Sequence, residues 1–235
     1  MIRISPGLDP LLRRPFSLHS MGSLTSKRQR RLSILFRTVG RGTRLMAEWT
    51  RGKPVDMIGP LGRGYTIPEG LRTGIMIAGG LGIASLFGLA ESITRKGNGT
   101  HVRAYVGGKS KPDVLLKKEL EDMGATVRVT TEDGSLGTRG LITQLFERDG
   151  PHLAKDSETM VYACGPLEML ATVAAINQEL SIPCQVSLEA RMACGVGSCL
   201  SCVVRTRDEG YQMVCKNGPV FDASRIDWKN TERLL

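Results

Sequence analysis

The middle of the chain alternates between short apolar runs and amphipathic segments. Residues 74–79, "GIMIAG", are continuously apolar, which is typical of a strand buried on both faces of a sheet. Residues 83–95 place their apolar side chains at helical spacing. The alternation predicts a parallel sheet covered by helices on both faces. Further strands are predicted at 101–108, 125–131 and 158–166, and further helices at 112–124, 140–150 and 167–180.

The first seventy residues have shorter and less regular apolar runs. Residues 2–4 and 32–39 have the apolar and β-branched content of strands. The glycines of "GRGT" at 40–43 predict a turn, followed by a short helix through Trp49. Prolines and glycines in residues 59–70 then indicate a boundary between two units.

The alternation stops after Pro183. The remaining residues contain most of the cysteines and little helical periodicity, and a unit this small needs a bound group or cross-link to hold it together. We therefore predict three domains, which span residues 1–70, 71–182 and 183–235.

Composition and charge narrow the function only slightly. The chain is 41% hydrophobic and 23% charged, as expected of a globular protein, with a formal net charge of +9 at pH 7. A basic balance favours acidic partners, either nucleic acid or phosphorylated small molecules. The run "KRQRR" at 27–31 is typical of a solvated loop. Nucleic-acid binding is the alternative, but no recognised motif supports it.

The sequence favours neither export nor a membrane span. Its start, "MIRISPGLDP", lacks the apolar stretch of a signal peptide. We therefore expect a cytoplasmic protein whose cysteines serve metal or redox chemistry. Residues 74–90 are uncharged and just long enough to cross a bilayer. The five glycines among them favour strand, turn and helix instead.

Closely spaced cysteines near the end of the chain are the strongest chemical signal. The spacing is C-x4-C-x2-C, then twelve residues, then a fourth cysteine, which matches the plant-type [2Fe–2S] pattern. Gly195 and Gly197 allow the loop to bring backbone N–H groups toward sulfur. The predicted ligands are Cys194, Cys199, Cys202 and Cys215.

Structural zinc is the main alternative for this loop, and free thiols are a third. Zinc sites usually combine two short pairs of ligands or mix Cys with His, whereas Cys215 stands alone and no His lies nearby. The spacing therefore favours iron–sulfur. We interpret Cys184 as a buried small hydrophobe. Cys164 is placed at the carboxyl end of a strand, where open α/β sheets bind ligands.

Three glycines separate the apolar strand at 74–79 from the following helix. They are Gly79, Gly80 and Gly82, in "IMIAGGLGIAS". The pattern departs from G-x-G-x-x-G, but it still permits a tight turn and leaves a helix N-terminus free to receive a pyrophosphate. The alternative is a tight turn that binds no ligand.

Several motifs together resemble one protein family. They are "LLRRPFS", "VGRGT", "GPLGRGY", "IAGGLGIA", "DGSLGTRG", "CGP" and "EARMACGVGSCLSC…CKNGPVFD". The chain resembles, over nearly its whole length, the electron-transfer subunit of class 1B dihydroorotate dehydrogenase, a ferredoxin-reductase-like flavoprotein. The resemblance implies a multi-domain α/β plus β fold. A partial antiparallel β-barrel for the flavin would be joined to a parallel α/β nucleotide-binding domain and a small C-terminal iron–sulfur module.

The resemblance also implies where cofactors bind. FAD would contact Arg14, Pro15, Phe16, Ser17, Leu35, Phe36, Arg37, Gly42 and Thr43. NAD would contact Gly79, Gly80, Gly82, Cys164, Gly165 and Pro166. The domain at 1–70 is shorter than the family's flavin barrel, so either the true start lies upstream or the first strands of the barrel are absent.

The function implied by the resemblance is a redox relay in pyrimidine biosynthesis. An FMN-containing catalytic subunit, in a heterotetramer of two plus two chains, would oxidise dihydroorotate. Electrons would pass through [2Fe–2S] and FAD to NAD⁺, because flavin converts between one-electron and hydride transfer. No residue here is predicted to be a catalytic acid or base. The alternatives are the small subunit of NADH-dependent ferredoxin:NADP⁺ oxidoreductase or sulfide dehydrogenase, and, in another class, a zinc-stabilised nucleic-acid-binding module.

Overall fold

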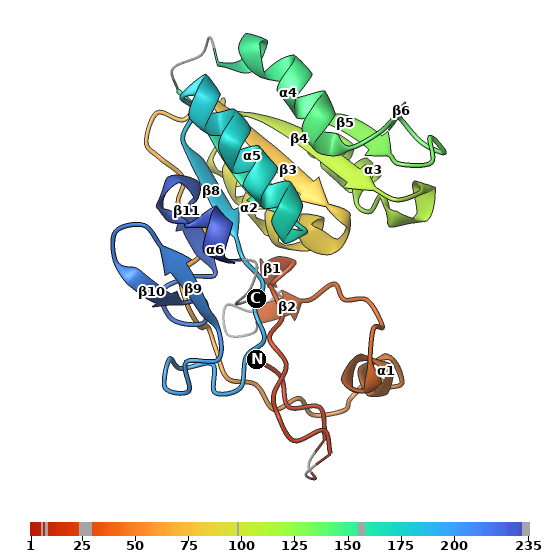
Figure 1. Ribbon diagram of the computed structural model, residues 1–235. Helices are drawn as coiled ribbons and strands as arrows, with labels where there is room; N and C mark the ends of the chain where they lie inside the picture. Colours follow the sequence, from red (N-terminus) through yellow and green to blue (C-terminus); the bar gives the residue numbers. More distant parts are fainter. Residues whose placement is uncertain (6, 8, 24–29, 98, 155–157, 232–235) are drawn as a thin grey trace.

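A seven-stranded sheet forms the centre of the protein (Figure 1). The computed structural model describes all residues except 6, 8, 24–29, 98, 155–157 and 232–235. The strands follow the order β11-β8-β7-β3-β4-β5-β6, and within the sheet β11 is antiparallel while the others are parallel. Their bounds are β3 (Thr73–Gly79), β4 (His101–Gly108), β5 (Thr126–Thr131), β6 (Thr138–Arg139), β7 (Thr159–Cys164), β8 (Cys184–Ser187) and β11 (Val220–Asp222).

Helices cover both faces of this sheet, as predicted (Figure 1). The helices are α2 (Ile83–Lys96) and α3 (Lys117–Asp122) on one face, and α4 (Ile142–Leu153) and α5 (Leu167–Leu180) on the other. Successive side chains of β3 point to opposite faces. Ile75 and Ile77 therefore pack with α4 and α5, whereas Met76 and Ala78 pack with α2.

Most predicted elements of this region are confirmed. Residues 74–90 form β3, a 3₁₀ turn at Gly80–Gly82 and the start of α2. None of the helices in the described part of the chain is long and apolar enough to span a membrane. The helix predicted at 112–124 is wrong in its first half. There Lys111–Asp113 is a separate 3₁₀ turn, and Leu116 takes a left-handed φ of 58° that prevents a continuous helix.

The N-terminal region is less regular. It contains the antiparallel strands β1 (Ser20–Ser23) and β2 (Arg30–Ser33) and the helix α1 (Arg41–Ala47). The strand predicted at 32–39 ends at Ser33, because Ile34 and Phe36 instead pack into a small apolar cluster. The strand predicted at 2–4 is reduced to bridges from Ile2 to Arg14 and Met57.

The described residues of this region thus form one two-stranded sheet and isolated bridges, as an incomplete barrel would. The small cluster contains Ile2, Ile4, Phe16, Ile34, Phe36, Leu45, Met46 and Trp49. Of the basic run at 27–31, residues 27–29 lie outside the described residues, and the last two arginines belong to β2.

The C-terminal residues extend the sheet and add a hairpin beside it. The hairpin consists of β9 (Val203–Thr206) and β10 (Gly210–Met213), and a short helix, α6 (Trp228–Thr231), packs on β9. A 3₁₀ turn, Ala223–Arg225, follows β11. The division at residues 70 and 182 remains a prediction, but β8 continues the sheet beyond the second of these positions.

Candidate functional site

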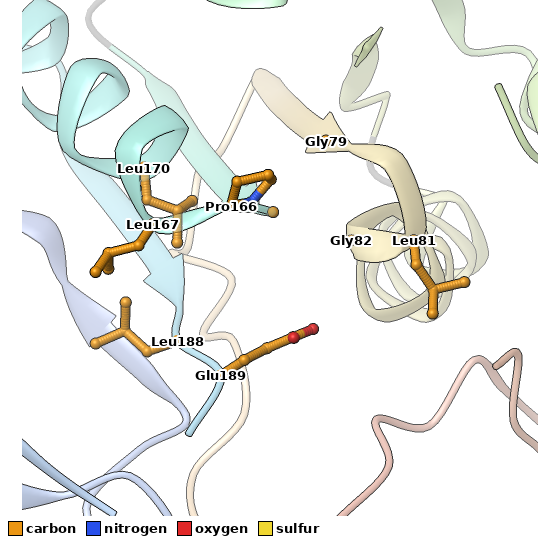
Figure 2. Close-up of a pocket in the computed structure, with 9 residues that line it drawn as sticks. Gly79, Leu81, Gly82, Pro166, Leu167, Leu170, Leu188 and Glu189 are labelled. Carbon is orange, nitrogen blue, oxygen red and sulfur yellow. The ribbon is translucent and has the colours of Figure 1, made fainter. Parts of the chain in front are cut away.

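A hollow of about 280 Å³ opens at the carboxyl ends of β3, β7 and β8 (Figure 2). Open α/β sheets bind ligands at this edge. The hollow is lined by Gly79, Leu81, Gly82, Gly165, Pro166, Leu167, Leu170, Leu188 and Glu189. Its wall is mainly apolar, and the Glu189 carboxylate projects into it.

Two glycine-containing turns approach closely at this hollow. A Cβ on Gly82 would lie 2.1 Å from the carbonyl oxygen of Cys164, and one on Gly165 would lie 2.6 Å from Cε of Met169. Gly80 has a φ of 52° and open space around it, so the turn needs glycine there for its backbone angle. At Gly82 and Gly165 the turn before α2 and the turn before α5 therefore bring bare backbone to the hollow, a cradle that fits a pyrophosphate.

The structure brings most of the predicted NAD residues together. Four of them line the hollow, and Gly80 belongs to the same turn. Cys164 is different, because it is only 3% exposed and packs on the α2 side of the sheet. Burial raises the pKa of its thiol to about 11. Its contact with NAD remains a prediction.

The sequence analysis missed several lining residues, among them Leu188 and Glu189. These two follow β8, which pairs with β7 in parallel. The parallel pairing places the carboxyl ends of the two strands at one edge. A prediction of β8 as a further parallel strand would have placed these two residues at the sheet edge. The predicted alternation of strands and helices, however, stopped at Pro183.

The cysteine loop surrounds one sulfur with backbone N–H groups. The N–H groups of Ser198 and Cys199 donate to Sγ of Cys194 at 3.3 and 3.4 Å. Gly195 and Gly197 take left-handed φ angles of 74° and 83°, which permits this tight wrap. Backbone donors of this loop lower the pKa of Cys194. The same donors favour the thiolate, which is the form that binds metals.

The other three cysteines complete the arrangement. The Ser201 hydroxyl lies 3.2 Å from Sγ of Cys199 and lowers the pKa of that thiol to about 6. Cys202 and Cys215 are buried beside each other. Burial, followed by the neighbouring Cys202, raises the pKa of Cys215 to about 11, while the backbone of Gly197 donates to its sulfur.

Cys199 lies next to Cys194, Cys202 lies next to Cys215, and Cys194 is close enough to influence the pKa of Cys215, so the four thiols share one neighbourhood. Within the described ranges of the chain, no three Cys, His, Asp or Glu side chains are grouped as ligands of a single metal ion. The number of thiols matches the four ligands of a [2Fe–2S] cluster.

The predicted flavin segments also meet. Phe16 and Phe36 pack edge to face with ring centroids 6.0 Å apart. The Arg14 side chain passes next to Gly42, with Nε 3.5 Å from where a Cβ would be. Thr43 caps α1, because its Oγ1 accepts the N–H groups at residues 39 and 40.

The remaining flavin candidates differ in their surroundings. Pro15 and Ser17 are exposed, and Leu35 is half-buried. The Ser17 hydroxyl and the Phe16–Phe36 pair offer the polar and apolar contacts that suit an amphipathic flavin ring. Arg37 is engaged elsewhere, since Nη2 donates to Oδ1 of Asp113 at 2.8 Å. This ion pair ties the N-terminal region to the nucleotide half of the molecule.

Two family models match the chain. Residues 189–227 match "Iron-sulfur cluster binding domain of dihydroorotate dehydrogenase B". Residues 76–175 match "Oxidoreductase NAD-binding domain". The two matches coincide with the cysteine loop and with the part of the sheet that contains the glycine turn.

Curated relatives match nearly the whole chain. A protein of Desulforamulus reducens is 37% identical over 231 residues, covering 97% of this chain and 85% of the relative. Proteins of Bacillus caldolyticus and Fusobacterium nucleatum are 37% and 35% identical, each covering 96% of this chain and 84% of the relative. All three are named "Dihydroorotate dehydrogenase B (NAD(+)), electron transfer subunit".

Solved structures share the fold. The structure described in "Insights into flavin-based electron bifurcation via the NADH-dependent reduced ferredoxin-NADP oxidoreductase structure" gives a TM-score of 0.82 at 23% identity, covering 100% of this chain and 80% of the other. "Ferredoxin reductase in carbazole 1,9a-dioxygenase" gives 0.55 at 19% identity, covering 72% and 51%. The predicted ferredoxin-reductase-like fold is therefore confirmed.

Proposed function

Because the chain belongs to the family of electron transfer subunits of dihydroorotate dehydrogenase B (NAD(+)), we propose that it relays electrons from a catalytic partner subunit to NAD⁺. Identity of 37% over nearly the whole chain favours this function over the ferredoxin:NADP⁺ oxidoreductase alternative. The likeness to that enzyme, at 23% identity, concerns the fold alone. The observation that carries the proposal is the set of four cysteines, with backbone N–H groups directed at Cys194, inside the matched iron–sulfur domain.

Cys194, Cys199, Cys202 and Cys215 would hold a [2Fe–2S] cluster. When bound, the cluster carries single electrons, NAD⁺ accepts a hydride, and FAD converts between the two. The backbone N–H groups directed at Cys194 and Cys215 stabilise negative charge on sulfur. They thereby help to set the reduction potential.

The hollow at the sheet edge would hold NAD⁺. The glycine turn and the start of α5 would receive its pyrophosphate. Leu167, Leu170 and Leu188 would exclude water from one side. The Glu189 carboxylate can accept hydrogen bonds from a ribose hydroxyl or a carboxamide, and its charge favours the cationic nicotinamide of NAD⁺ over the neutral ring of NADH.

The N-terminal segments would hold FAD. Phe16 and Phe36 provide an apolar base, and Arg14 and Ser17 provide hydrogen-bond donors for flavin or pyrophosphate oxygens. In Figure 1 this N-terminal region and the β9–β10 hairpin, which follows the cysteine loop, both lie below the sheet.

The partner in this proposal is an FMN-containing catalytic subunit that oxidises dihydroorotate to orotate, in a heterotetramer of two plus two chains. The names of the relatives, which specify an electron transfer subunit, support a catalytic partner. No residue of this chain is assigned as a catalytic acid or base. A cytoplasmic location agrees with the use of free thiols as ligands.

Metal and flavin content tests the proposal. We expect about two irons and two sulfides per chain, with flavin, after anaerobic purification. The Cys199→Ser variant loses the cluster, whereas Cys184→Ser, which changes a buried sheet residue, keeps it. Equal iron in the two variants, or zinc without iron in the unaltered protein, would contradict the assignment. Co-purification with an FMN-containing dihydroorotate oxidase separates this function from the ferredoxin:NADP⁺ alternative.

A further inference from the structure

One surface segment, residues 56–67, runs from the N-terminal region past the cysteine site to the nucleotide sheet, and we call it the strap. Its first part belongs to the N-terminal region. Met57 forms a bridge with Ile2, which forms another with Arg14. The start of the strap is therefore one extended segment away from the arginine that begins the predicted flavin motif.

The middle of the strap presses against the chain that follows Cys215. Gly62 has a φ of 71°, and a Cβ on it would lie 2.1 Å from the carbonyl oxygen of Gly218. The Arg63 N–H donates to this same oxygen at 2.5 Å, and the Val220 N–H donates to the carbonyl of Arg63 at 3.3 Å. The two backbones can approach this closely only because residue 62 has no side chain.

The same part of the strap reaches the other end of the cysteine site. Side chains of Leu61 and Met1 occupy the space into which a Cβ on Gly195, next to Cys194, would project. Residues 61–63 therefore contact the segments beside the first and the last of the four cysteines.

The end of the strap is fixed to the nucleotide sheet. The Thr66 N–H donates to Oε1 of Gln185 at 2.9 Å, and Nε2 of Gln185 donates back to Oγ1 of Thr66 at 2.5 Å. The hydroxyl of Tyr162, which is fully buried, donates to the carbonyl of Thr66 at 3.0 Å. This end can move only if buried strands move with it.

We propose that the strap sets the separation between the iron–sulfur cluster and the flavin, and that Gly62 is the positioning residue that allows it. The inference rests on the proposed function. Electron transfer between two centres slows steeply as they move apart. Hydride transfer between nicotinamide and flavin does not cross the Gly62–Gly218 contact. Widening that contact therefore slows one step and spares the other.

The test is Gly62→Ala in the cofactor-loaded complex with its catalytic subunit. Alanine would place its Cβ 2.1 Å from the carbonyl oxygen of Gly218, so the two backbones must move apart. After rapid mixing with NADH, we expect the flavin to be reduced at the unaltered rate and the cluster several-fold more slowly. Gly64→Ala is the matched control, because no atom lies within 4 Å of its Cβ position. It should leave both steps unchanged.

Two further measurements separate positioning from general damage. Iron content and the EPR spectrum of the reduced cluster should match those of the unaltered complex, since the ligands are untouched. If Gly62→Ala does not fold or loses its cluster, Leu61→Ala, which leaves the backbone unaltered, replaces it and should slow cluster reduction alone.

The inference is overturned if the folded variant reduces its cluster at the normal rate. It is also overturned if flavin and cluster reduction slow equally. Failure of NADH to reduce the cluster in the unaltered complex would instead contradict the proposed function.

Discussion

The nucleotide sheet and the N-terminal region position their candidate sites by different means. The side chains of Ile75, Met76 and Ile77 in β3 are fully buried, and the glycine turn follows directly. In the N-terminal region, by contrast, Val39 is 80% and Leu11 64% exposed. The sheet holds its site by packing, whereas the N-terminal site depends on ion pairs, a small apolar cluster and contacts with its neighbours.

The largest contrast is expected in the two aromatic contacts. Phe146 is fully buried and packs on Tyr105 with ring centroids 5.7 Å apart. We expect Phe146→Ala to lower the free energy of unfolding by about 3–5 kcal/mol. Phe36→Ala, in the half-buried Phe16 contact, should cost only about 1 kcal/mol and should lower the flavin content. Denaturant unfolding and flavin absorbance measure both effects. Equal losses of stability would contradict the contrast.

A second prediction compares two glycines. Gly82→Ala places a methyl group against the Cys164 carbonyl, so we expect a loss of about 1–3 kcal/mol together with weaker NADH binding. Gly64→Ala, in the exposed N-terminal region, should change neither quantity. Thermal unfolding and NADH titration test this. An unaltered NADH affinity in Gly82→Ala would show that the turn does not form the nucleotide site.

A third prediction concerns the carboxylate of the hollow. A charge pair about 4 Å apart in water is worth about 1 kcal/mol, or about fivefold in affinity. Glu189→Gln should therefore weaken NAD⁺ about fivefold and leave NADH nearly unchanged. Glu179→Gln, at the far end of α5, is the control. Equal changes for both nucleotides, measured by calorimetry, would exclude the charge effect.

The smallest effect is expected at the ion pair that joins the two regions. The Arg37 guanidinium lowers the pKa of the Asp113 carboxyl. Because the pKa is lower in the folded state, the ion pair stabilises the fold at pH values above the ordinary pKa of 3.8. This stabilisation is lost as the pH falls through the lower pKa of the folded state. Asp113→Asn should therefore lower the melting temperature slightly at neutral pH. The difference should shrink below pH 3.8, and a difference that widens there would contradict the assignment.

The sequence predicted those helices and strands whose own residues show a clear hydrophobic pattern. The strand, glycine turn and helix at 74–90 needed only an apolar run and helical spacing. The prediction of a strand at 34–39 was wrong. Its apolar side chains Ile34 and Phe36 pack in the N-terminal apolar cluster, and within the described residues its backbone does not pair with a neighbouring strand. The interruption at Leu116 has no local signal, because a left-handed leucine is disfavoured on its own.

The cluster ligands and the glycine turn could be predicted from the sequence, because cysteine spacing and glycine position depend on neighbours within a few residues. How these segments meet in space is a property of the folded chain. Folding brings Cys215 beside Cys202, Glu189 to the nucleotide hollow and Gly62 against Gly218. These contacts join residues far apart in the chain. They depend on strand order and on close backbone approach, which no periodicity along the chain encodes.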